Sequence, residues 1–128
     1  MIYLSEDEFR SLVSRAIDRI PEKFAKNLNN VGFVVEDQPT IEQRRRNHLH
    51  PNQTLFGLYE GIPLTKRGAG YNLVLPDKIT IFKLPIEAAC SDMNELENQV
   101  NNTVWHEVAH YFGLDHKMIK DLETKHEG

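Results

Sequence analysis

Apolar residues recur at helical spacing in two long stretches of the chain, one near each end. The first stretch predicts an amphipathic helix that begins at Ser5, where Ser5 and Glu8 can form a capping box, and extends to about Ile20. In the second stretch an apolar side chain recurs at every fourth position, at Leu96, Val100, Val104 and Val108. This spacing predicts a long, buried helix over about 92–112, and Gly113 is expected to end it as a C-cap glycine.

Between these two stretches the pattern changes to short runs that are rich in β-branched and aromatic residues. The runs over residues 31–36, 54–60 and 77–84 predict three strands, and the third is a candidate edge strand that could pair with an extended peptide. The polar segment 37–52 and the glycine-rich segment 61–71 are expected to be loops, and Pro85 is expected to open a short helix.

The order of helix, strands and helix predicts an α+β fold in a single domain over residues 1–128. We expect a small mixed sheet of about three or four strands, packed on the N-terminal helix and on the long C-terminal helix. A length of 128 residues suits one hydrophobic core, and 40% hydrophobic with 27% charged residues is an ordinary balance for a globular protein.

Charge and cysteine content narrow the class of protein further. The formal net charge of −4 lacks the basic excess of dedicated nucleic-acid-binding proteins, so a nucleic-acid partner is not favoured. A single cysteine, Cys90, excludes an internal disulfide and favours a reducing compartment. Neither a secretory leader nor a run long enough to span a bilayer is visible, so we expect a cytoplasmic protein with no membrane partner.

The motif that carries chemistry lies at the end of the long predicted helix, where residues 106–116 read HEVAHYFGLDH. His106 and His110 are about one helical turn apart, so their imidazoles share a face and could hold one zinc ion. A turn at Gly113 would let His116 fold back as a third ligand, which leaves the fourth position open as in catalytic zinc sites. Glu107 lies about 100° round the helix from His106, beside the metal rather than on it.

These side chains together have the chemistry of a metal-dependent hydrolase that acts on a peptide or protein substrate. Zinc would acidify water and polarise a carbonyl group, and Glu107 would be the general base that takes the proton from water. An oxyanion stabiliser would complete the site, with Tyr59, Tyr71 and Tyr111 as candidates, although each also fits a core or rim position.

The motif HEVAHYFGLDH resembles the extended HExxHxxGxxH motif of the metzincins, and the chain more closely resembles the short bacterial zincin-like metallopeptidases, or minimal zincins. The likeness extends upstream through LFGLYEGIPL at residues 55–64 and LPDKITIF at residues 75–82. The resemblance implies one compact zincin-like domain, one zinc ion and a peptidase activity. Carried onto the motif, the catalytic residue is Glu107 and the metal ligands are His106, His110 and His116.

Two other functions fit parts of the same sequence. The tail Gly113-Leu114-Asp115-His116 also resembles the bacterial rRNA-maturation endoribonucleases, which have three histidines at the same spacing but lack the glutamate after the first. A catalytically silent, zinc-stabilised interaction module is the other alternative, in which the basic run Arg44-Arg45-Arg46 could contact an acidic partner. Such a run is more often a solvated loop, and imidazole ligands also suit transition metals other than zinc.

Overall fold

The computed structural model describes residues 2–61 and 77–114, and it has the mixed α+β fold that the sequence predicts. Within these residues the elements follow in the order α1 (Glu6–Asp18), α2 (Glu22–Ala25), β1 (Val31–Glu36), α3 (Ile41–Arg46), β2 (Gly57–Glu60), β3 (Asp77–Phe82), α4 (Lys83–Ala89) and α5 (Met93–Tyr111). None of the helices in this part of the chain combines the length and the hydropathy of a membrane span.

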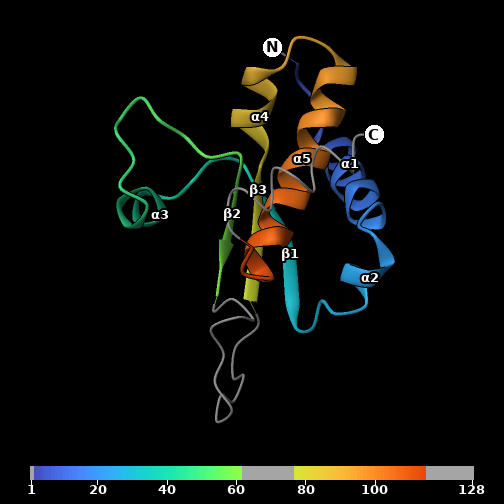
Figure 1. Ribbon diagram of the computed structural model, residues 1–128. Coiled ribbons are helices and arrows are strands. Elements are labelled where there is room, and N and C mark those ends of the chain that lie inside the picture. Colours follow the sequence, from blue (N-terminus) through green and yellow to red (C-terminus); the bar gives the residue numbers. More distant parts are fainter. Residues whose placement is uncertain (1, 62–76, 115–128) are drawn as a thin grey trace.

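The three strands form one mixed sheet in the order β1-β3-β2 (Figure 1). Strand β1 runs parallel to β3, and β2 runs antiparallel to it, so that Ile79 of β3 pairs with Phe33 on one side and with Tyr59 on the other. The mixed sheet is therefore confirmed, but the expectation that the third strand lies at an edge is wrong. β3 is the central strand because the parallel partner β1 and the antiparallel partner β2 occupy both of its sides.

Helix α5 lies between the sheet and α1, which makes it the central element of the fold (Figure 1). The predicted stripe along α5 is fully buried, and it packs with residues of α1 and β3 in one hydrophobic core. Burial of this many branched and aromatic side chains supplies most of the driving force for the fold. The fully buried members of the core are Phe9, Ile79, Ile81, Ile86, Leu96, Val100, Val104 and Val108.

Both ends of α5 are defined by local hydrogen bonds. At the start, the Asp92 carboxylate accepts a hydrogen bond of 2.8 Å from the backbone N–H of Glu95. At the end, Gly113 adopts a φ of 74° and donates to the carbonyl of His110, while Leu114 donates to the carbonyl of Ala109. These two bonds form a Schellman motif, which only a residue that tolerates left-handed backbone closes without strain. The predicted C-cap role of Gly113 is confirmed.

Segment 37–52 is not the plain loop that its polar sequence suggests, because it contains the short helix α3. Thr40 and Gln43 form a capping box at the start of α3. The Gln43 side chain is buried and donates a hydrogen bond of 2.9 Å to Glu60 at the end of β2. Helix α3 is thereby attached to the edge strand by a contact between residues distant in sequence, which local patterning does not reveal.

The strand predicted over 77–84 ends at Phe82, and the helix expected from Pro85 already begins at Lys83. The Lys83 ammonium group forms a buried ion pair of 3.1 Å with Glu87, one helical turn later. Glu87 also accepts a hydrogen bond of 2.8 Å from the backbone N–H of Leu4, which ties the N-terminal segment to α4. A helical conformation brings residues four positions apart together, so this ion pair favours the early end of the strand.

Candidate metal centre

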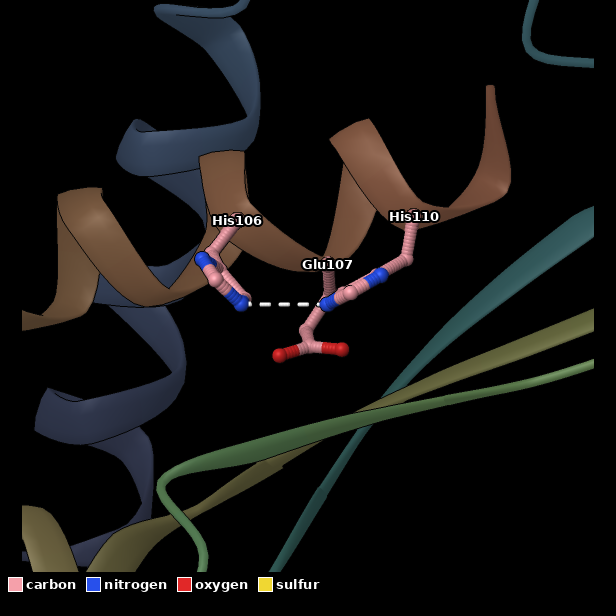
Figure 2. A group of neighbouring side chains, drawn as sticks. All are labelled: His106, Glu107 and His110. Carbon is pink, nitrogen blue, oxygen red and sulfur yellow. Dashed lines mark hydrogen bonds between the residues drawn. The ribbon is translucent and has the colours of Figure 1, made fainter. Parts of the chain in front are cut away.

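The two histidines of the motif lie on the last turns of α5 and face each other. The Nε2 atoms of His106 and His110 are 3.0 Å apart, and both rings are half-buried (Figure 2). They share one side of the helix because a spacing of four residues is close to one helical turn. The two imidazoles therefore converge, as their spacing in the sequence predicts.

The donor set formed by these side chains fits a transition-metal ion. Two nitrogens bound to one tetrahedral zinc ion would be about 3.3 Å apart, which differs little from the observed separation. One ligand atom each from His106, Glu107 and His110 lies within 4.8 Å of the others. Imidazole nitrogen is a good donor for zinc, so the described residues provide two ligands that fit it. The third predicted ligand, His116, lies outside the described residues.

Glu107 lies between the two histidines, and its carboxylate points toward strand β2 (Figure 2). Only 7% of this residue is exposed to solvent. Burial raises the pKa of the Glu107 carboxyl group to about 7, against a smaller lowering by the backbone N–H of Tyr59. Glu107 therefore lies beside the two histidines that could hold a metal ion, with a pKa near neutral pH.

The close approach of β2 to α5 depends on Gly57, a residue that the sequence analysis did not single out. A β-carbon at Gly57 would lie 2.6 Å from Cγ2 of Thr103, closer than real carbon atoms pack. The strand can therefore lie directly on the helix at the turn that carries Glu107. The available signal was a glycine inside a strand-forming run, which often marks a close backbone approach.

Two adjoining hollows flank the histidine pair and share four lining residues: Leu55, Gly57, His106 and Glu107. The Tyr59 hollow, of about 360 Å³, extends toward His110 and is also lined by Asn47, Leu58 and Tyr59. The Asn102 hollow, of about 460 Å³, extends toward the start of α5 along Gln99, Asn102 and Thr103. Because they meet at His106 and Glu107, the hollows form one groove that crosses the candidate metal centre.

Of the tyrosines considered as oxyanion stabilisers, Tyr111 is buried in the core, whereas Tyr59 is half-buried and lines the groove. The Tyr59 hydroxyl donates a hydrogen bond of 2.8 Å to the buried carboxylate of Asp77. The fully buried Tyr111 hydroxyl accepts from the backbone N–H of Asn29 and donates to its carbonyl, both at 3.3 Å. Tyr111 thus fits the alternative role of a core aromatic and Tyr59 that of a rim aromatic, whereas Tyr71 lies outside the described residues.

Two of the three arginines in the basic run make specific intramolecular contacts. Arg44 donates to the backbone carbonyls of three residues after α3, namely His50, Pro51 and Gln53. Arg46 forms ion pairs with Glu42 and Glu60. The Arg44 contacts join α3 to the following turn, whereas Arg45 and Arg46 are exposed on the surface of this short helix.

Comparisons with known proteins bear on the family and the fold. The sequence profile of the zincin-like metallopeptidases matches residues 28–126. A solved structure of a conserved hypothetical protein from Thermus thermophilus is similar, with a TM-score of 0.58 and 21% sequence identity over 85% of this chain and 94% of that chain. At this identity the similarity shows the fold alone. No curated protein matches the chain.

Proposed function

Because the chain belongs to the zincin-like metallopeptidase family, we propose that it is a zinc-dependent peptidase with Glu107 as its general base. The observation that carries the proposal is the convergence of two histidine nitrogens, 3.0 Å apart, beside the buried Glu107 carboxylate. All three side chains lie where the groove crosses α5. A peptide that lies along the groove would therefore pass directly in front of them.

In this proposal His106 and His110 hold the zinc ion together with His116, which the sequence motif supplies as the third ligand. A zinc ion held there would be a Lewis acid that acidifies water and polarises the carbonyl group of a peptide bond. Because His106 and His110 are on the rigid central helix, little ordering entropy opposes the binding of the ion.

Glu107 has the role of proton carrier. Its carboxylate accepts a proton from the attacking water and donates that proton to the nitrogen of the departing amine. Apart from the effect of a bound ion, burial raises the pKa of the carboxyl group to about 7, which favours acceptance of a proton from water. The backbone N–H of Tyr59 orients the carboxylate from the side of β2.

Two features favour this function over the alternatives. A silent zinc-stabilised module needs no proton carrier, whereas a buried carboxyl group with a raised pKa is typical of a functional site. An endoribonuclease would benefit from a basic surface for RNA, whereas this chain has a formal net charge of −4 and Arg44 is engaged in contacts within the chain.

The test compares metal content and peptide hydrolysis for untagged wild-type protein, His110→Ala and Glu107→Gln, with the exposed His50→Ala as a matched control. We expect about one zinc ion per chain in the wild type, Glu107→Gln and His50→Ala, and loss of zinc in His110→Ala. Cleavage of a fluorogenic peptide pool should fall by at least about a hundredfold in Glu107→Gln and persist in His50→Ala. A wild type that takes up no zinc, or Glu107→Gln with undiminished cleavage, would contradict the proposal.

A further inference from the structure

The Asn102 hollow is lined along α5 by a row of neutral polar side chains. Gln99, Asn102, Thr103 and His106 follow each other at positions i, i+3, i+4 and i+7, so they lie on one helix face that leads to the candidate metal centre. Thr54 adds a hydroxyl group from the opposite wall. Of the described residues that line this hollow, only His106 and Glu107, at its inner end, can carry a charge.

The hydrogen-bonding groups in this hollow are both donors and acceptors. The Gln99 amide nitrogen donates to the Thr103 hydroxyl at 3.1 Å, which leaves the Gln99 amide oxygen as an acceptor. Within the described residues the half-buried Asn102 carboxamide makes no hydrogen bond, so it offers two N–H donors and a carbonyl oxygen. A guest that filled the hollow would have to satisfy both kinds of group, since a buried unpaired polar group is costly.

This chemistry discriminates among peptide side chains. An aliphatic side chain would dehydrate the Asn102 carboxamide without replacing its hydrogen bonds. An acidic or a basic side chain would lose hydration without meeting an opposite charge among the lining residues of the outer part of the hollow. A glutamine or asparagine side chain matches the lining, because its carboxamide presents a donor and an acceptor together while its methylene groups can pack on Leu55 and Phe56. A volume of about 460 Å³ also leaves room for ordered water around it.

Resting on the proposed peptidase function, we propose that the Asn102 hollow is a substrate subsite that selects a glutamine or asparagine side chain next to the scissile bond. Asn102 is its main specificity-determining residue. The adjacent Asn101 is also half-buried but does not line the hollow, so it provides a control of the same residue type one position away.

The experiment measures peptide binding to the zinc-loaded Glu107→Gln protein by fluorescence anisotropy, so that binding is seen without cleavage. The probes are labelled alanine hexapeptides in which Gln, Leu, Glu or Lys is placed in turn at each interior position. At one position we expect the Gln peptide to bind roughly three- to tenfold more tightly than the other three. Adding Asn102→Ala should remove this preference, and adding Asn101→Ala should keep it.

A third variant tests whether the loss of preference in Asn102→Ala results merely from misfolding. Adding Asn102→Asp should turn the preference toward the Lys peptide, a gain that a misfolded protein cannot show. The inference is overturned if the Gln, Leu, Glu and Lys peptides bind equally tightly at every position, or if no hexapeptide binds. It is also overturned if the preference for the Gln peptide survives Asn102→Ala. Should Gln peptides bind as expected but remain uncleaved by the zinc-loaded wild type, the subsite stands and the peptidase assignment fails.

Discussion

Gly57 of β2 lies against the side chain of Glu107 on α5 so closely that a β-carbon at Gly57 would be 3.0 Å from Cγ of Glu107. The edge strand thus reaches the carboxylate with its backbone, and the Tyr59 N–H in the same strand is placed to bond to it. The separation of β2 from α5 therefore sets the position of Glu107 relative to the two histidines.

Gly57→Ala should lower the rate of peptide cleavage by at least about tenfold while zinc content stays at the wild-type level. The added methyl group has to displace Thr103 and Glu107, and overpacking of this kind costs about 1–3 kcal/mol of stability. Urea unfolding and steady-state kinetics measure both effects. Gly32→Ala is the matched control, because the nearest atom to its new β-carbon would be 4.0 Å away. Equal activity of the two variants would show that the strand does not position Glu107.

Metal-free Glu107→Gln should be more stable than metal-free wild type at pH 8, by up to about 3 kcal/mol. The folded protein raises the pKa of Glu107 from 4.5 to about 7, so its contribution to stability is fully present below pH 4.5 and is lost as the pH rises through 7. The two proteins should therefore converge in stability near pH 4.5.

Urea titrations with a chelator at both pH values measure this difference. Glu36→Gln, at an exposed position at the end of β1, controls for the loss of one negative charge. A Glu107→Gln protein that gains nothing at pH 8 would mean that the carboxylate is better solvated than its burial indicates.

Tyr59→Phe should reduce stability by about 1–3 kcal/mol and leave kcat nearly unchanged, because the lost hydroxyl bonds to the buried Asp77 carboxylate. Thermal unfolding and kinetics on the folded fraction distinguish the two effects. The exposed Tyr3 gives a control, and Tyr3→Phe should change neither quantity. A large fall in kcat at unchanged stability would instead assign the Tyr59 hydroxyl to the reacting carbonyl group.

Arg44→Gln should reduce stability by about 1–3 kcal/mol, whereas Arg45→Gln should change it by less than about 0.5 kcal/mol. The reason is that Arg44 donates to three backbone carbonyls, while Arg45 is exposed at the surface of α3. Urea unfolding of both variants measures the difference. Equal changes in the free energy of unfolding would mean that the Arg44 hydrogen bonds do not stabilise the turn after α3, and that the two arginines contribute only as surface charges.

The sequence was sufficient for the parts of the site that depend on local geometry. His106, Glu107 and His110 are within one turn of a strongly patterned helix, so the periodicity of α5 alone places them together. The end of the helix was predictable for the same reason, since Gly113 closes a local motif with Ala109, His110 and Leu114.

The parts that depend on distant contacts were not predictable in this way. Helix α3 has no apolar stripe, and its anchor to β2 is the contact between Gln43 and Glu60. The central position of β3 depends on pairing with two separate strands, for which its own sequence has no signal. The closeness of Gly57 to Glu107 likewise joins residues that only the folded sheet brings together.

The two walls of the groove should differ in mobility, because one of them belongs to the most central helix of the fold. Since α5 is buried against both the sheet and α1, its amide protons should exchange with solvent only when the whole domain unfolds. The opposite wall is formed by the segment before β2 and by the short strand itself, at the edge of the described sheet. Breathing motions that admit and release a peptide should therefore arise in that wall, while the chemical groups on α5 keep a fixed frame.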